Sequence, residues 1–315
     1  VKEITVSENT DLLSLADQLD NEGVINYGTI FKLYVRVKGD NQGVLAGSYA
    51  LNPNMDYGQI IDTLVNMSST ETMQITIPEG YSIAQIKQLL LDEHVCMEDA
   101  LDEELNTYAF KHEFLQSELP AEEGWLEGYL FPDTYEIYKG NATVRNTINT
   151  MLNNFGDKYD EEIQAGADAL GRSMHDIVTV ASLIEREAQV DSERATIAGV
   201  IYNRLNNSGE FPYLQVDASV LYGLGRTGGT LSEEDLNSDS PYNLYNHEGL
   251  PPGPICNPGY ASLYAAAHPE EHNYYYYVAM PDGTHLFANS YEEHQANIAT
   301  SDAAQAAAQA EAAAN

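Results

Sequence analysis

The sequence predicts an α+β protein in which small helix-and-strand units precede a larger part built of mixed helices and a β-hairpin. Three patterns support this fold class. Strand-like runs alternate with amphipathic helices up to residue 112, two consecutive helical patterns fill residues 173–205, and two strand-like runs near the C-terminus are separated by Asp282 and Gly283. With 315 residues, 43% of them hydrophobic, the chain can bury at least one sizeable core.

The first 72 residues predict one small α/β unit. Leu12, Leu15 and Leu19 fall on one helix face, and Gly23 ends that helix. Such a unit could bind glycan or serve as scaffolding, and both interpretations stay open. The expected elements are a strand at 3–6, helices at 11–22 and 27–38, a strand at 47–51 and a helix at 57–65.

Residues 73–140 predict a second α/β segment and a connector. A strand at 73–77, a turn at 78–80 and an amphipathic helix at 83–94 come first. The aromatic-rich stretch around 125–138 then offers rings that could stack on sugars or pack in a hinge. We expect a helix at 144–155, followed by a turn rich in Asp and Glu.

The charge balance narrows the range of partners. The chain has 14 basic and 49 acidic residues and a net charge of −35, which argues against nucleic acid and against an anionic membrane surface. A neutral polymer such as a glycan remains compatible. We expect Cys96 and Cys256 to be buried and inert, and no apolar run has the length of a membrane span or a signal peptide.

A carboxylate on the first of the two central helices is the leading catalytic candidate. Ser173 and Asp176 form a capping-box pattern, which predicts a helix at 174–188. Helical spacing directs Glu187 into the apolar arc, whereas Glu185 falls at or beyond the rim. Burial raises the pKa of a carboxyl group, as a general acid near neutral pH requires. The alternative is a solvated helix end with weak ion pairs.

A loop at 240–259 is expected to be stiff, because its second half is rich in Pro and Gly. It carries Tyr242, Asn243 and Tyr245, side chains suited to presentation rather than to simple connection. A helix at 218–224 precedes this loop. After it we expect a helix at 260–267, a hairpin of strands at 274–279 and 285–288, and an Ala/Gln-rich tail at 301–315 that extends a helix or stays disordered.

Motifs for other chemistries are absent from the sequence. It has no phosphate-binding glycine loop, no HExxH and no CxxC. His247, His268 and His285 could meet around a metal, but isolated histidines more often pack or lie on the surface, so we expect no metal and no cofactor. A carboxyl group on an apolar helix face, next to a stiff loop that carries Asn and Tyr side chains, is the combination of groups expected in a glycosidase-like site.

Long ordered motifs resemble the bacterial endolytic murein transglycosylases, the MltG or YceG-like family. The resemblance covers nearly the whole chain. The motifs are IPEGYS (77–82), LEGYLFPDTY (126–135), ASLIERE (181–187), SER (192–194), VIYNRL (200–205), LQVDASVLYGLG (214–225), SPYNLY (240–245), GLPPGPICNPG (249–259), AAAHP (265–269) and HLFANSYEEH (285–294).

The resemblance implies an enzyme that cleaves the β-1,4 bond between N-acetylmuramic acid and N-acetylglucosamine in nascent peptidoglycan strands. The product carries a 1,6-anhydro ring, and cleavage limits strand length during cell-wall synthesis. The family's architecture implies a LysM-like N-terminal part and a catalytic domain outside the cytoplasmic membrane. A single-pass N-terminal anchor, absent from this chain, and cell-wall synthesis proteins as partners are further expectations.

The same resemblance implies the site residues. Glu187 is the expected acid and base, because lytic transglycosylases of other families place this glutamate before a small residue, as Glu187 precedes Ala188. Glu185 is the alternative. The expected domains are 1–72 (LysM-like), 73–140 (connector), 141–300 (catalytic) and 301–315 (tail). The expected substrate-binding residues are Gln215, Asp217, Tyr222, Tyr242, Asn243, Tyr245 and Asn257.

Two other functions remain open. In a hydrolytic muramidase, a second carboxylate such as Asp217 would activate water, and the products would end in a reducing sugar. A non-catalytic scaffold would bind glycan strands through its N-terminal part without cleaving them.

Asn203 and Arg204 could contact substrate or form a buried polar clamp between helices.

Overall fold

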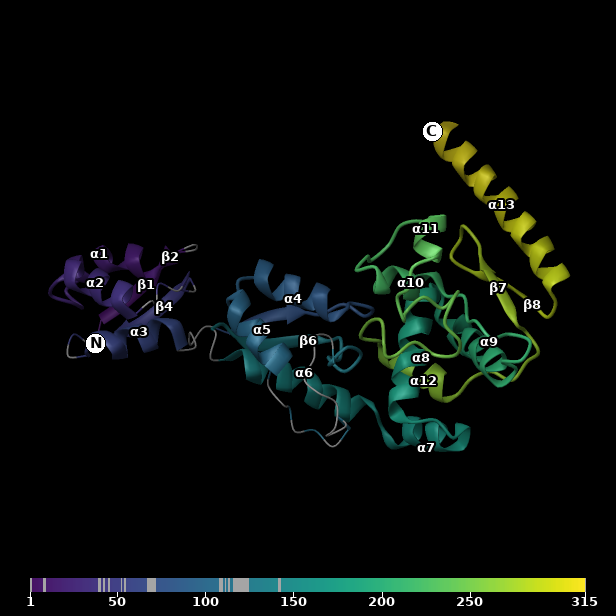
Figure 1. Cartoon of the computed structure of the whole chain (residues 1–315), viewed down its shortest axis with the longest axis horizontal. Helices are drawn as coiled ribbons and strands as arrows, with labels where there is room; N and C mark the ends of the chain where they lie inside the picture. The colour runs from purple at the N-terminus through teal and green to yellow at the C-terminus, as the bar shows by residue number, and fades with distance from the viewer. Residues whose placement is uncertain are drawn as a thin grey trace. The chain divides into compact units, whose positions relative to one another are not determined.

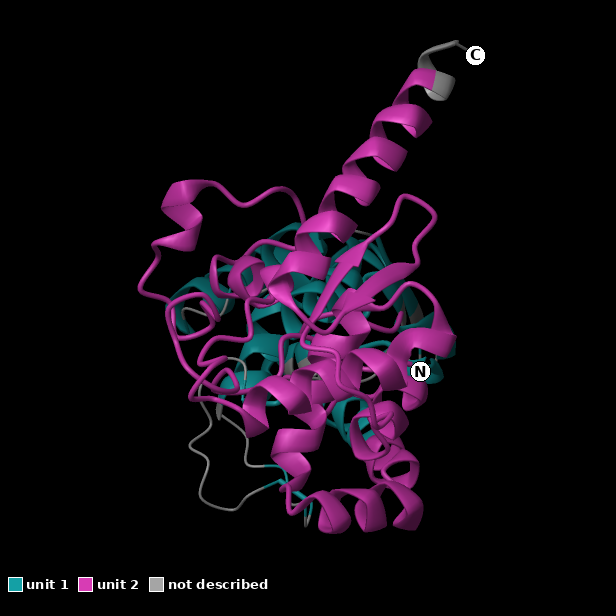
Figure 2. Ribbon diagram, turned by 90° about the vertical axis from the view of Figure 1, so that its right-hand side faces the viewer, with its two compact units in different colours: residues 1–77, 83–126, 133–152 teal, residues 78–82, 127–132, 153–315 magenta. Residues whose placement is uncertain are grey.

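The computed structural model contains two compact units (Figure 2). Unit 1 comprises residues 1–77, 83–126 and 133–152, and unit 2 comprises 78–82, 127–132 and 153–315. Helices and antiparallel strand pairs occur in both units, which confirms the α+β class (Figure 1). The expected domain limits at residues 72, 140 and 300 stay a prediction. The structure describes residues 2–7, 10–38, 41, 43–44, 46–51, 53, 55–66, 72–107, 110, 112, 114–115, 125–140 and 143–314.

The N-terminal part of unit 1 follows the predicted element order. Strand β1 (Lys2–Val6) pairs antiparallel with β4 (Gly47–Leu51), so that Ile4 faces Tyr49 across the ladder. Fully buried side chains, including Leu15, Phe31 and Leu64, make one core between strands and helices. The remaining elements are β2 (Thr10–Asp11), α1 (Leu12–Asn21), α2 (Gly28–Lys38), β3 (Gly43–Val44) and α3 (Tyr57–Asn66).

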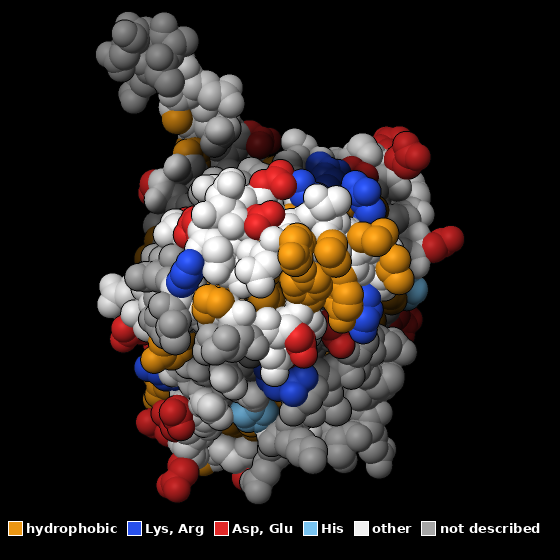
Figure 3. Space-filling model, turned by 90° about the vertical axis from the view of Figure 1, so that its left-hand side faces the viewer, with side chains coloured by type: hydrophobic (Ala, Val, Ile, Leu, Met, Phe, Trp, Pro, Cys, Tyr) orange, Lys and Arg blue, Asp and Glu red, His pale blue; other side chains and the backbone are white. Residues whose placement is uncertain are grey.

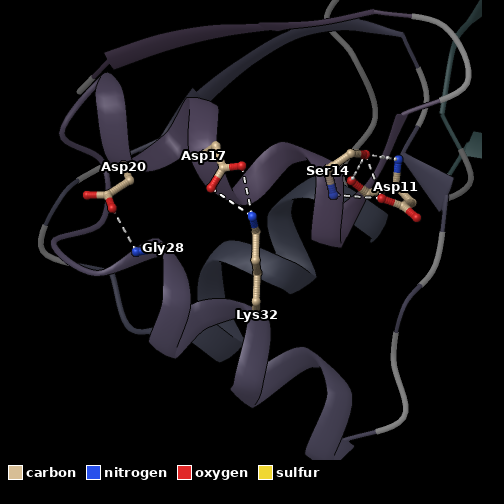
Figure 4. A network of polar contacts seen from close by, with 6 residues as sticks. All are labelled: Asp11, Ser14, Asp17, Asp20, Gly28 and Lys32. Carbon is tan, nitrogen blue, oxygen red and sulfur yellow. Dashed lines mark hydrogen bonds and ion pairs between the residues drawn. The ribbon is translucent and has the colours of Figure 1, made fainter.

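Polar contacts fix the beginning of α1 and join it to α2 (Figure 4). Asp11 and Ser14 form a capping box, which satisfies backbone N–H groups of the first turn. The Asp20 carboxylate accepts from the Gly28 backbone N–H at 2.8 Å, and Lys32 donates to Asp17 at 2.7 Å. These contacts hold the two helices in register beside the apolar core.

The second part of unit 1 contains a strand pair that the sequence revealed only in part. Strand β5 (Thr72–Thr76) pairs antiparallel with β6 (Thr134–Tyr138), whose side chains are alternately exposed and buried. The aromatic stretch was not expected to contain a strand. Helix α4 (Ile83–Asp92) was expected, whereas α5 (Glu98–Thr107) was not. The expected segment up to residue 112 lies partly outside the described residues.

Unit 2 is mostly helical, and α12 packs against α7, α8 and α9 at its centre (Figure 1). The hairpin β7–β8 is confirmed, with Ala279 paired to His285, and α13 packs against both strands. The elements after α6 (Val144–Lys158) are α7 (Glu161–Leu170), α8 (Met174–Glu187), a 3-10 turn (Asp191–Glu193), α9 (Arg194–Asn206), α10 (Asp217–Gly223), α11 (Glu233–Leu236), α12 (Tyr260–Ala267), β7 (Tyr276–Ala279), β8 (His285–Ala288) and α13 (Tyr291–Ala314).

The acidic turn expected after α6 is wrong, because that segment contains helix α7. The Asp160 carboxylate accepts from the backbone N–H groups of Glu162 and Ile163, and Ile163 and Ala167 are buried. Gly171 ends the helix in the left-handed conformation, with φ of 65°. The Ala/Gln-rich tail extends α13 as far as Ala314.

The two cysteines are buried, as expected, and burial raises the pKa of the Cys96 thiol to about 12. Among the helices that the structure describes, none combines the length and the apolar character needed to cross a bilayer.

Candidate active site

Glu187 is the last residue of α8, and it lines a cavity of about 650 Å³. The capping box at Ser173 fixes where α8 begins, and eight consecutive buried residues from Ile177 to Ile184 fix its orientation. The half-buried Glu187 side chain therefore leaves the packed part of the helix at the cavity wall. The rest of the wall comes from Arg186, Gln189 and Tyr245, from residues 214–217, and from α9, the hairpin β7–β8 with the residue before it, and α13.

A tyrosine from the hairpin holds the Glu187 carboxylate. The Tyr277 hydroxyl donates to Oε2 of Glu187 at 3.0 Å. Burial raises the pKa of Glu187, and the nearby negative charge of Asp217 acts in the same direction. The Tyr277 hydrogen bond and the closeness of His285 act in the opposite direction. The net result is a carboxyl group that holds its proton more strongly than an exposed glutamate does.

A second carboxylate lines the same cavity. The Tyr245 hydroxyl donates to Oδ1 of Asp217 at 2.6 Å, and burial raises the pKa of Tyr245 above its usual range. Gln215 has a positive φ of 56°, and its side-chain oxygen accepts from Arg204 at 2.6 Å. The cavity thus contains a carboxyl group with a raised pKa and a second one bound by a phenol.

Arg204 and Asn203 anchor the hairpin to α9. The Arg204 guanidinium donates to the backbone carbonyls of Tyr213 and Tyr275, and Asn203 donates to the carbonyls of His272 and Tyr274. These hydrogen bonds form a polar clamp, but it joins α9 to residue 213 and to the segment before β7 and not to a second helix, as was considered above. Arg204 also lines the Glu187 cavity, and it lines a smaller adjoining cavity of about 300 Å³ as well.

His285, the first residue of β8, links the hairpin to Glu193 and contacts the Tyr277 ring. Its Nδ1 lies 2.8 Å from Glu193, and the same carboxylate accepts from the His285 backbone N–H at 3.1 Å. The His285 and Tyr277 rings meet edge to face, with centroids 5.5 Å apart. This contact ties the position of the Tyr277 ring to the turn before α9.

Glu185 has a different environment, and its expected place at the rim is wrong. Its side chain is only 7% exposed. It accepts from the Ser262 hydroxyl at 2.8 Å and from the Gly259 backbone N–H at 3.1 Å, and it lies 3.4 Å from the Arg194 guanidinium. Helix α12 and the start of α9 cover this side of α8, which a helical projection of α8 alone does not reveal.

The seven expected substrate-binding residues fall into two groups. Gln215, Asp217 and Tyr245 lie around the Glu187 cavity. Tyr222, Tyr242, Asn243 and Asn257 are not part of its wall.

The second group makes contacts that order the loops around it. Asn257 accepts from Leu130 N–H at 2.8 Å and donates to the buried Glu127 at 3.1 Å, and Tyr222 donates to the same carboxylate at 3.1 Å. The Tyr242 ring packs edge to face on Tyr222. Asn243 donates to the backbone carbonyls of residues 236 and 238.

The sequence argument missed Tyr277 as a partner of Glu187, although it expected the strand that carries it. The signal was weak, because four consecutive tyrosines at 274–277 give no indication of which hydroxyl faces inward. Pairing of β7 with β8 settles the alternation. In the part of the chain that the structure describes, no group of three or more potential metal ligands gathers, and His285 pairs with Glu193 instead.

Comparison with known proteins gives consistent matches. The YceG-like family model matches residues 4–300. An endolytic murein transglycosylase of Bacillus subtilis (strain 168) is 34% identical over 304 residues, which cover 92% of this chain and 82% of that protein. A protein of the same name from Streptococcus pneumoniae serotype 2 is 30% identical over 322 residues, covering 94% of this chain but 57% of the relative.

A solved structure also matches almost the whole chain. It is the crystal structure of a yceG-like protein from Listeria monocytogenes, with a TM-score of 0.62 and 29% sequence identity. The match covers 93% of this chain and 98% of that one.

Proposed function

Because the chain belongs to the YceG-like family, we propose that it is a lytic transglycosylase that cleaves peptidoglycan strands internally. The observation that carries the proposal is the Glu187 carboxyl group, which has a raised pKa, lines a 650 Å³ cavity and accepts a hydrogen bond from Tyr277. The names of the relatives support the substrate, and the cavity chemistry supports the acid.

Glu187 performs both proton transfers. In its neutral form it donates a proton to the oxygen that links C1 of N-acetylmuramic acid to O4 of N-acetylglucosamine, and the C1–O4 bond breaks. The resulting carboxylate then accepts the proton of the muramic C6 hydroxyl while O6 forms a bond to C1. The products are a strand with a free O4 hydroxyl and one with a 1,6-anhydro ring. No water is consumed, and Glu187 returns to its neutral form.

Tyr277, Asp217 and Tyr245 prepare this exchange. Tyr277 stabilises the carboxylate that forms midway, because its hydroxyl donates to the ionised form. The Asp217 carboxylate, which accepts from the Tyr245 hydroxyl, faces the positive charge that develops at C1. Gln215 and Tyr245 are suited to hold sugar hydroxyls in the same cavity.

A hydrolytic muramidase is the second candidate, and one observation favours it. Asp217 lines the same cavity as Glu187, so that it could activate a water molecule as the second carboxylate of an inverting enzyme. The Tyr245 hydroxyl, 2.6 Å from Asp217, competes with such a water for the carboxylate. This contact favours the transglycosylase.

The N-terminal part of unit 1 is proposed to be a LysM-like glycan-binding module. Its support is the order β1–α1–α2–β4 with β1 and β4 paired antiparallel. The catalytic part is proposed to act at the outer face of the cytoplasmic membrane, held there by an N-terminal membrane anchor. A non-catalytic scaffold would retain this module's binding without using Glu187.

Mass spectrometry of uncrosslinked glycan strands tests the proposal. The wild-type protein should release fragments with anhydro ends, and Glu187→Gln should release none. Asp217→Asn is the matched control, because it removes a carboxylate from the same cavity and should still give anhydro ends, more slowly. Reducing ends would identify a muramidase. Cleavage by Glu187→Gln would move the acid to Glu185, and binding without cleavage by the wild type would favour the scaffold.

A further inference from the structure

Four large apolar side chains gather on the exposed side of α2 and at its start. The exposed fractions are 63% for Tyr27, 52% for Ile30, 60% for Leu33 and 79% for Val37. Elsewhere in the described chain, the only other exposed large aliphatic side chain is Ile298, at 37%. Figure 3 shows hydrophobic side chains in one continuous patch on this face. We call these four residues the α2 patch.

Packing within the module does not account for the α2 patch. At 100° per residue its members fall within an arc of about 120°. The side of the helix that faces the core carries Phe31 and Val35, both with no exposed surface. Helix α2 therefore has a buried apolar face that folding explains and a second apolar face that folding leaves in water. Contiguous exposed patches of this kind mark interaction sites.

The charges along α2 are opposite to those of the whole chain. The helix has Lys32, Arg36 and Lys38 and no acidic residue, so it holds three of the 14 basic residues of a chain with 49 acidic ones. Lys32 is neutralised by Asp17 at 2.7 Å. Arg36 and Lys38 are exposed, and no ion pair of either is found within the described residues.

These two cations lie on opposite flanks of the α2 patch. Arg36 projects about 60° beyond one edge of the apolar arc, and Lys38 projects about 20° beyond the other. Lys38 also lies 5.7 Å from the centre of the Tyr34 ring, which keeps its stem along the helix. In Figure 3 basic side chains are seen at the margins of the hydrophobic patch.

We propose that α2 docks on an anionic phospholipid surface. Ile30, Leu33 and Val37 enter the boundary between headgroups and acyl chains, Tyr27 lies at headgroup level, and Arg36 and Lys38 contact phosphates. A basic flank on each side of an apolar stripe is the pattern of interfacial helices. A second copy of the chain fits less well, because two α2 helices packed together would oppose like charges with no acid between them.

The net charge of −35 is compatible with membrane binding by α2, but it limits which part of the surface can contact an anionic bilayer. The sequence argument against anionic membranes used the total charge, which conceals an 11-residue helix whose only charged residues are basic. Elsewhere the acidic surface is repelled from the bilayer. The repulsion confines contact to the α2 patch and so orients the N-terminal module on the lipid.

Vesicle flotation of the full 315-residue chain tests the proposal. Phosphatidylcholine vesicles that contain phosphatidylglycerol should bind the protein more tightly than vesicles of phosphatidylcholine alone. Arg36→Gln should weaken binding to the mixed vesicles by about fivefold. The double variant Leu33→Ser, Val37→Ser should weaken it by about tenfold or more. Both positions are exposed, so circular dichroism should show an unchanged fold.

Matched controls separate the patch from the rest of the chain. Ile298→Ser removes an exposed aliphatic side chain from α13 and should bind as the wild type does. Glu187→Gln should also bind normally, because the proposal does not depend on catalysis. Equal binding to both vesicles, no binding to either, or binding that survives the double variant would overturn the proposal. Self-association that the double variant abolishes would instead assign the patch to a second copy.

Discussion

Tyr277→Phe removes one hydroxyl and leaves the ring that packs against His285. The lost interaction is the donation to Glu187 at 3.0 Å. A hydrogen bond to a charged group contributes about 1.5–3 kcal/mol, and here it stabilises the ionised form. Its removal therefore raises the pKa of Glu187 further, in the direction that burial already favours.

The proposed mechanism gives this change a measurable sign. Cleavage begins with neutral Glu187, so activity falls on the alkaline side as that group loses its proton. In Tyr277→Phe the midpoint of the alkaline limb should move upward by about one pH unit or more. At the optimum the rate should fall about tenfold, because the carboxylate that forms midway has lost its donor. The assay is the release of anhydro-ended fragments across a pH series.

Tyr276→Phe is the matched control for this experiment. Tyr276 precedes Tyr277 on β7 and lines the same cavity, but among the described residues its hydroxyl has no hydrogen bond. Its alkaline limb should stay where the wild type has it. An alkaline limb that does not move in Tyr277→Phe, or that moves downward, would refute the assignment of Tyr277 as the positioning residue of the acid.

Three further outcomes are expected. Glu185→Gln should lower the free energy of unfolding by about 2 kcal/mol in denaturant titrations, since it leaves the buried Arg194 guanidinium with only the exposed Asp191 carboxylate as a charged partner. Gly128→Ala should lower Tm, because Gly128 has φ of 90° and an added Cβ would lie 2.6 Å from Pro254. Glu187→Gln should melt above the wild type at neutral pH, with the difference vanishing in acid, because a raised folded pKa costs stability as pH rises through it.

Local patterns along the chain predicted most helices and strands well. The capping box at Ser173 located the start of α8, and helix 260–267 and strand 285–288 have the expected limits. Strand β6 was missed because its pairing with β5 spans about 60 residues of chain, and alternation over five residues is weak evidence without the partner. Helix α7 was missed because the acidic residues of its first turn resemble a loop, although they suit a helix N-terminus.

The two glutamates at the end of α8 show where reasoning along the sequence stops. A helical projection distinguishes Glu187 from Glu185 only by the direction of each side chain, and it places only Glu187 toward the interior. Both side chains leave bulk solvent, however, and the difference between them is the set of partners that other elements bring. Arg194, Ser262 and the Gly259 backbone occupy the Glu185 carboxylate, whereas Glu187 has one phenol and an open cavity. The Glu185 contacts converge on Oε2 and tie that carboxylate to α9 and α12, whereas Glu187 faces the cavity in which a substrate could lie, so the partners, more than the burial, favour Glu187 as the acid.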